Sequence, residues 1–396
     1  MLEIDPNARY VESDPHLEVL CDQARYERRI GVDLEFIRQS TYFAKLALVQ
    51  IAVGEQHLLI DPLGDVDLGP LESVMLDPGV CKVLHAPSQD LEIFFHRLGE
   101  PPRNIFDTQM AAAMAGLGHQ ASYSSLVSMV LGVELRHSEG FTDWLRRPLT
   151  GTQEAYALDD VRHLFALQER LTEQLEQMGR MSWFVEECSQ YEELDRYRTP
   201  PEELFTQVKS RNKLNPRGLA ILRELAIWRE EEAMRQDRPR RRVLLDEVLV
   251  EIARRAPSDV KTLKRVRELR IRDQGALNSL LDAVKRGQEV PRDDCPRPRR
   301  RTRVSRDPSL AVSMLKTAFK VQCDRQNIAP AMVGNASDIE RLVRRYFDDP
   351  ERSEGDPLLK GWRGDLVGGI LLEILTGEVG LHLDPESGAP EFHELE

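Results

Sequence analysis

The sequence predicts an α/β layer domain followed by all-helical modules, and three observations lead to this prediction. The first 200 of the 396 residues alternate short apolar runs typical of strands with amphipathic stretches typical of helices. After Thr199-Pro200-Pro201 no convincing strand pattern appears. The charge also changes in blocks: residues 1–203 carry −18, residues 204–306 carry +13 and residues 307–396 carry −8. This distribution indicates separate modules, of which the middle one is suited to meet phosphates.

The composition excludes several classes of protein. Hydrophobic residues make up 41% and charged residues 31%, as expected of a folded, soluble chain. The longest uncharged run, 108–133, is broken by polar side chains and glycines, so no membrane association is expected. The acidic N-terminus lacks the pattern of a signal peptide, and we expect a cytoplasmic protein. Widely spaced cysteines and the lack of a P-loop argue against a zinc ribbon, a disulfide framework and an ATP-driven motor.

The expected elements of the first domain follow in order along the chain. Apolar runs joined by short polar turns predict three strands, over 29–37, 46–54 and 57–61. A fourth strand is predicted over 81–86, and a helix follows it over 88–99. From Asp107 onward the pattern is helical, and it ends in a long amphipathic stretch over 152–178. Strands first and helices packed behind them predict a layered α/β fold.

The rest of the chain is expected to be helical. The middle region contains three helix patterns, over 214–237, 243–257 and 278–287. Residues 291–304 then combine three prolines with six arginines, which is the composition of a linker. From Pro308 to about Leu381 helical patterns return, and no exact internal repeat is present.

Two carboxylates mark the first candidate site. Asp33 and Glu35 lie in an otherwise apolar strand, and positions i and i+2 of a strand point to the same face. Their repulsion and desolvation must be offset, and a divalent cation would offset both. The alternative is a strand end that reaches solvent.

Three more residues share this chemistry. Asp90 follows the strand at 81–86, at the kind of strand end where α/β folds place their sites, although an acid in a first helical turn is also simply favourable. Tyr156 and Asp160 are four residues apart, so one helix face carries both. Core packing is the alternative for Tyr156. Adjacent Asp159 points about 100° away and cannot join the pair.

The order and spacing of these residues resemble those of the tyrosine-type DEDD 3′→5′ exonucleases. Within that group the stretches at 33–52, 106–116 and 142–160 are similar to the ribonuclease D family, and the stretch at 221–239 resembles its HRDC nucleic-acid-binding domain. The tail, most clearly at 359–371, resembles a divergent second HRDC domain. The resemblance implies a ribonuclease H-like exonuclease domain, with a mixed sheet flanked by helices, and two small all-α domains. Its boundaries are an exonuclease domain over 1–203, HRDC domain 1 over 210–290, a linker over 291–306, an HRDC-like domain 2 over 307–385 and an acidic tail over 386–396.

The resemblance also implies a reaction. Two divalent ions, Mg²⁺ or Mn²⁺, would be held by hard carboxylate oxygens and would stabilise the attacking and leaving oxygens of a phosphodiester. Asp33, Glu35 and Asp160 would hold one ion, and Asp33 with Asp90 the other. Tyr156 would orient the attacking water, because a phenol with a pKa of about 10 is a poor base. The expected products are 5′-mononucleotides released from RNA 3′ ends, those of precursor tRNAs among them, by a monomer without a protein partner.

The basic middle region supplies candidate RNA contacts. The arginines and lysines that would meet phosphates are Arg238, Arg240, Arg241, Arg242, Lys261, Lys264, Arg265 and Arg267. The alternative is a solvated helical surface. Two rival functions also remain open from sequence: a DNA-directed exonuclease of the same superfamily, and a non-catalytic nucleic-acid-binding protein.

Overall fold

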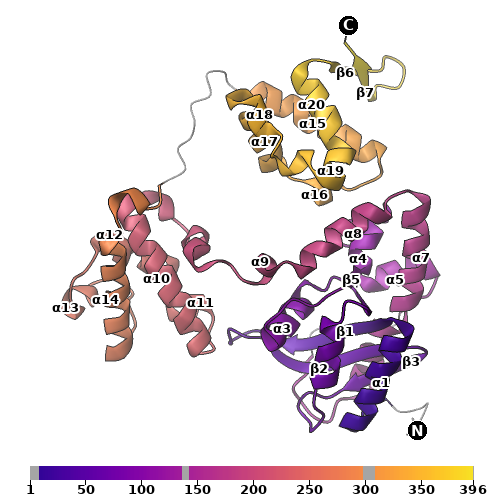
Figure 1. The fold of residues 1–396 in the computed structure, drawn as a ribbon, viewed down its shortest axis with the longest axis horizontal. Coiled ribbons are helices and arrows are strands. Elements are labelled where there is room, and N and C mark those ends of the chain that lie inside the picture. Colours follow the sequence, from indigo (N-terminus) through magenta and orange to yellow (C-terminus); the bar gives the residue numbers. More distant parts are fainter. Residues whose placement is uncertain (1–8, 136–141, 298–307, 396) are drawn as a thin grey trace.

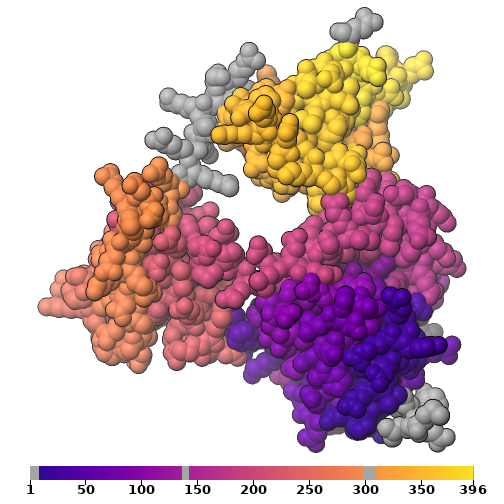
Figure 2. Space-filling view, viewed as in Figure 1, coloured from indigo at the N-terminus to yellow at the C-terminus, as the bar shows by residue number. Residues whose placement is uncertain are grey.

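The computed structural model describes residues 9–135, 142–297 and 308–395. Three parts are visible in Figure 1: a sheet-containing domain, a middle helical domain formed by α10 to α14, and a C-terminal domain formed by α15 to β7. The middle and C-terminal domains lie beside the first domain at different places, and the space-filling view shows an opening between the three parts (Figure 2).

The first domain is built on a five-stranded mixed sheet with the order β3-β2-β1-β4-β5. β1 pairs antiparallel with β2 and parallel with β4, and β4 pairs parallel with β5. The sheet therefore has the mixed character expected from the sequence. The strands are β1 (Arg29–Ile37), β2 (Lys45–Val53), β3 (Gln56–Ile60), β4 (Cys81–Leu84) and β5 (Ile105–Asp107).

Helices cover both sides of the sheet. They are α1 (Asp14–Glu27), α2 (Gly69–Leu76), α3 (Ser88–Leu98), α4 (Thr108–Met114), α5 (Tyr123–Leu131), α6 (Gly151–Arg162), α7 (Leu164–Gln177) and α8 (Met181–Ser189). α6 packs against β1, β2 and β3, and it begins with a capping box formed by Thr150 and Gln153. α1 contacts β1 and β2.

Strand register decides which residues face α6. In the β1–β2 pair Asp33 lies opposite Gln50 and Glu35 lies opposite Leu48, and residues opposite each other share a face of the sheet. Leu48 packs in a small cluster with Trp144 and Leu158, so this face is the one that α6 covers. The two carboxylates of β1 are thereby placed between the sheet and α6.

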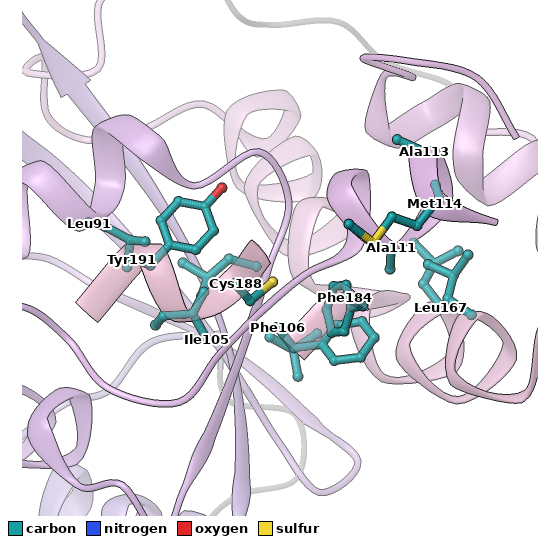
Figure 3. Close-up of a cluster of buried hydrophobic side chains, with 14 of the residues drawn as sticks. Leu91, Ile105, Phe106, Ala111, Ala113, Met114, Leu167, Phe184, Cys188 and Tyr191 are labelled. Carbon is teal, nitrogen blue, oxygen red and sulfur yellow. The ribbon is translucent and has the colours of Figure 1, made fainter. Parts of the chain in front are cut away.

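The core continues from the sheet into the later helices. Figure 3 shows α8 lying across β5 and α4, with Phe184 beside Phe106 and with Cys188 and Tyr191 next to Ile105. The Phe106 and Phe184 ring centroids are 4.6 Å apart. Because α8 is buried against the sheet on one side, it fixes the surface on which the C-terminal domain rests.

The middle domain has a hydrophobic core of its own. Its helices are α10 (Pro216–Arg235), α11 (Arg240–Val243), α12 (Asp246–Arg255), α13 (Val260–Leu263) and α14 (Gln274–Glu289). α10 packs against both α12 and α14, and its buried Leu222 and Leu225 join Leu249 and Leu280 in that core. The three predicted helices are thus present, with two short helices between them.

The C-terminal domain instead shares the core of the first domain. Its elements are α15 (Ser309–Arg325), α16 (Pro330–Val333), α17 (Ala336–Asp348), α18 (Pro350–Ser353), α19 (Gly361–Arg363), α20 (Gly369–Thr376), β6 (Val379–Leu383) and β7 (Pro390–Glu394). Trp362 is buried, its indole Nε1 donates to Glu187 of α8 at 2.7 Å, and Arg363 pairs with the same carboxylate at 2.8 Å. One continuous apolar cluster therefore spans both domains.

The structure corrects three details. β5 was not expected, because three buried residues are too short to show a strand pattern. The tail is not wholly helical, since β6 and β7 form an antiparallel hairpin that includes most of the predicted acidic tail. The stretch 152–178 is two helices, separated at His163. Most of the predicted linker, from residue 298 onward, lies outside the described residues. Within those residues no helix is long and apolar enough to cross a membrane.

Candidate active site

Three of the predicted carboxylates come together where β1 meets α6. Asp33, Glu35 and Asp160 each offer an oxygen, and these three atoms lie within 4.8 Å of one another. β1 supplies Asp33 and Glu35, because alternate residues of a strand point to the same face. α6, which packs on that face, supplies Asp160. The pairing of β1 with β2 shifts register between Glu35 and Phe36, so the strand is irregular immediately after the second acid.

Asp90 and Tyr156 line the same cavity, whose volume is about 310 Å³. Asp90 lies in the first turn of α3, directly after β4, and is 8% exposed. It does not belong to the group of three close carboxylates. Tyr156 lies one turn before Asp160 on α6 and is hydrogen-bonded to it. All five predicted catalytic residues thus border one cavity. Asp159 does not border it and pairs with Arg162 at 2.9 Å.

The four acids are held at an electrostatic cost. Burial raises the pKa of Asp33 to about 7, and burial together with the charge of Asp33 raises the pKa of Glu35 to about 8. Burial and the charges of both β1 acids raise the pKa of Asp160 to about 9. Burial, followed by the charge of Asp33, also raises the pKa of Asp90 well above its usual range. Raised pKa values mean that the ionised forms of these clustered acids are unfavourable. The acids can be ionised together at neutral pH only when a positive charge lies beside them.

Burial and the nearby acids also raise the pKa of the Tyr156 phenol, so it stays protonated at neutral pH. A protonated phenol holds a water molecule by hydrogen bonding and does not remove its proton. A protonated phenol is compatible with the positioning role expected from the sequence, which stays a prediction.

Sequence reasoning missed several residues of the cavity wall. His85 was not singled out from the sequence, and its ring nitrogens lie 2.9 Å from the Thr108 hydroxyl and 3.1 Å from the Ala121 carbonyl. Tyr123 of α5 lies beside it, donates to the Asp159 carbonyl at 3.1 Å and borders a second hollow of about 190 Å³ shared with Tyr156 and Asp160. Neither residue lies in a spacing pattern that would have marked it.

The predicted basic residues of the middle domain fall into three groups. Arg238, Arg241 and Arg242 are exposed and line a hollow of about 590 Å³ between α10, α11 and the segment before α14. This hollow also gathers Arg235, Arg270 and Arg272, which the sequence analysis did not single out. Lys261, Lys264, Arg265 and Arg267 are exposed outside it.

Arg240 forms the third group, because its guanidinium is already paired. It contacts the buried Glu230 carboxylate, which also accepts from the Tyr42 hydroxyl. The backbone N–H groups of Tyr42 and Phe43 donate to Asp237 at 2.9 and 3.0 Å. The loop that follows β1 thus holds the middle domain against the first domain.

Comparison with known proteins agrees with this geometry. Residues 8–176 match the 3′-5′ exonuclease family, and residues 218–276 match the HRDC domain. Fold and site together therefore define a 3′→5′ exonuclease that carries an HRDC domain.

The relatives are more specific. Ribonuclease D of Granulibacter bethesdensis is 36% identical over 383 residues, covering 96% of this chain and 95% of the relative, and that of Pseudomonas paraeruginosa is 33% identical over 377 residues, covering 93% and 98%. The crystal structure of Escherichia coli RNase D superposes with a TM-score of 0.78 at 31% identity, covering 94% of this chain and 99% of that one. The chain belongs to the ribonuclease D family. It is an exoribonuclease, a hydrolase that acts on RNA from the 3′ end.

Exonucleases of this kind are generally dependent on divalent metal, and the site fits such ions. Carboxylate oxygens are hard ligands that suit Mg²⁺ and Mn²⁺. The buried acids have no cationic side chain among the residues that line their cavity, which contains neither Lys nor Arg. The missing positive charge is therefore expected from metal.

Proposed function

We propose that this exoribonuclease uses two divalent ions, Mg²⁺ or Mn²⁺, to trim the 3′ ends of structured RNAs, precursor tRNAs among them, and releases 5′-mononucleotides in the cytoplasm. The observation that carries the proposal is the close group of the half-buried Asp33, Glu35 and Asp160, with the buried Asp90 in the same cavity. Two bound ions would supply the charge that stabilises the attacking and leaving oxygens of the phosphodiester.

The roles of the side chains follow from their positions. Asp33, Glu35 and Asp160 would together hold one ion, and Asp33 would share the second with Asp90, which lines the same cavity. Tyr156 would hold the attacking water in line with the scissile bond, since its hydrogen bond to Asp160 places the phenol beside the carboxylates. The ions held by these acids would bind the terminal phosphate, which the carboxylates alone would repel.

We further propose that the middle domain holds the body of the RNA through its exposed arginine hollow. Arg238, Arg241 and Arg242 reach this hollow from the segment around α11, and Arg270 and Arg272 reach it from the segment before α14. Guanidinium groups on two walls can contact phosphates of one strand or of two neighbouring strands. Phosphate contacts of this kind give affinity without reading sequence, which suits an enzyme that accepts many 3′ ends.

The C-terminal domain has the helix order of the middle domain, which supports a second HRDC-like fold. In both, a long helix of 20 or 17 residues is followed by a four-residue helix, a helix of 10 or 13 residues and another four-residue helix. We propose domain boundaries at 1–203, 210–290 and 307–385 on this basis, and a chain that works as a monomer.

The experiment is a metal-dependent digestion of a 5′-labelled tRNA with a 3′ extension, resolved at single nucleotides. Stepwise shortening from the 3′ end, dependent on Mg²⁺ or Mn²⁺ and stopped by a chelator, is the expected result. Release of 5′-mononucleotides identifies the bond that is cut. A matched DNA oligonucleotide is the comparison for sugar preference. Equal rates on both would assign the chain a broader substrate class, and internal cleavage or metal-independent activity would contradict the proposal.

A further inference from the structure

One buried side chain beside the carboxylates has no assigned role. Gln50 lies in the middle of β2, in a run of otherwise apolar residues, and its exposed fraction is 0%. Neither its amide oxygen nor its amide nitrogen has a hydrogen-bond partner among the described residues. A fully buried amide without a partner is destabilising, and most buried polar groups in folded proteins are paired.

The position of Gln50 points to its partner. In the register of the sheet it lies directly opposite Asp33 on one side and Leu59 on the other. Opposite residues of an antiparallel pair have Cβ atoms about 4.5–5.5 Å apart on one face, so the Gln50 amide, which makes no direct hydrogen bond to Asp33, is within reach of its carboxylate through one water. Its other neighbours on this face, Leu48 and Leu59, offer no polar atom.

Asp33 is the acid that the proposed function places on both ions. A carboxylate that holds metal is usually fixed by a donor behind it, and removing such a donor weakens metal binding or activity about 10- to 100-fold. Asp33 already accepts from the Leu34 backbone N–H. In the cavity wall the His85 nitrogens are engaged with Thr108 and Ala121, and the Tyr123 hydroxyl donates to the Asp159 carbonyl.

We propose that Gln50 is a positioning residue for Asp33: its amide N–H donates to one bridging water that donates to the Asp33 carboxylate, and this link fixes the orientation in which Asp33 binds metal. The proposal rests on the proposed metal-dependent function. Gln50 touches neither RNA nor the reacting phosphate. This role explains why a polar residue, Gln50, lies in the apolar strand β2: the acid opposite it is Asp33.

The test uses the full chain and a substitution that keeps the shape of the side chain. Gln50→Met removes both polar atoms with little change in volume. We expect its thermal midpoint in chelator to stay close to that of the wild type, because the buried apolar side chain offsets the loss of one water-mediated hydrogen bond. Its Kd for Mn²⁺, measured by calorimetry without RNA, should rise about 10- to 100-fold, and kcat should fall while KM for RNA stays nearly constant.

Gln168→Leu is the matched control, since this half-buried glutamine of α7 donates to the Cys81 sulfur away from the carboxylates. It should bind Mn²⁺ as the wild type does. Gln50→Asn keeps the amide but is one methylene shorter, so its Mn²⁺ affinity should lie between those of the wild type and Gln50→Met. It also serves if Gln50→Met does not fold.

Wild-type Mn²⁺ affinity in Gln50→Met, or in Gln50→Asn where that variant carries the test, would overturn the proposal. A loss of stability without a change in affinity would also overturn it and would leave Gln50 a packing role. These outcomes are separate from a failure of the proposed function, which would show as wild-type protein that binds Mn²⁺ and leaves RNA intact.

Discussion

The carboxylate cavity and the arginine hollow hold charge in opposite ways. Asp33, Asp90 and Asp160 lie between a sheet and helices, and burial raises the pKa of each. The arginines at 238, 241 and 242 extend into water around a hollow of the middle domain. Buried charges of like sign reduce the stability of the fold unless a counter-ion is bound. Exposed charges change the stability little, and salt screens their interactions. The first arrangement suits chemistry and the second suits affinity.

Removing one acid gives the largest expected effect. Asp33→Asn should lower turnover by about a thousandfold or more, because one ligand of a two-metal site supplies several kcal/mol of transition-state stabilisation. Its thermal midpoint in chelator should not fall, since a buried like charge is removed. Asp159→Asn is the control, because Asp159 pairs with Arg162 outside the cavity. Single-turnover rates and melting curves measure both. Near-normal turnover in Asp33→Asn would remove that residue from the site.

Tyr156→Phe should have a smaller effect on turnover. The ring stays in its contact with Trp144, at a centroid distance of 6.0 Å, while the oxygen that orients water is lost. We expect turnover to fall about 10- to 100-fold with Mn²⁺ affinity preserved. Parallel measurement of kcat and Mn²⁺ binding separates the two roles. A collapse of metal affinity would make Tyr156 a ligand or a fold element.

Changes in the arginine hollow should act on affinity alone. The triple variant Arg238→Gln, Arg241→Gln and Arg242→Gln should lower the slope of log affinity against log salt by about 2, as expected for three lost phosphate contacts to single-stranded RNA. Turnover on a short oligonucleotide should be unchanged. Arg352→Gln, at an exposed position of the C-terminal domain, is the control. An unchanged salt dependence on tRNA would place the RNA elsewhere.

Arg240→Gln sharpens the comparison, because this arginine belongs to the same run but is paired with buried Glu230. Losing the pair should destabilise the middle domain by about 1–3 kcal/mol, since the buried carboxylate keeps only its other partners. The salt dependence of RNA binding should stay as in the wild type. Denaturant unfolding and binding titrations test the two parts. A change in the salt slope without a loss of stability would make Arg240 an RNA contact instead.

The sequence predicted the carboxylates well because their chemistry leaves few alternatives. Asp33 and Glu35 in an apolar strand, and Tyr156 one turn from Asp160, are spacings that a strand and a helix convert directly into shared faces. Asp90 was placed by the strand end before it. Gln50 and Tyr123 could not be recognised from their spacing in the sequence. An uncharged residue in a strand or a helix is usually explained by packing.

The arrangement of the helical domains could not be read from the sequence. Arg235, Arg270 and Arg272 reach the hollow from separate segments, so only the tertiary fold brings them together. The C-terminal domain was expected to be a module behind a linker, and its Trp362 and Arg363 dock on Glu187 of α8. Such contacts depend on surfaces from distant parts of the chain, for which neither periodicity nor charge blocks give a signal.

The central claim, that the buried acids are held together for metal, is tested most directly by stability against pH with and without Mn²⁺. The pKa values of Asp33, Glu35 and Asp160 are raised to about 7, 8 and 9, so between about pH 4 and 9 the folded state keeps protons that the unfolded state has lost. In chelator, stability should therefore be greatest at the acidic end of this window and fall as pH rises through it. Saturating Mn²⁺ should remove this fall, because metal replaces the protons and binds more tightly as they leave. A flat profile in chelator, or one that Mn²⁺ does not change, would contradict the account.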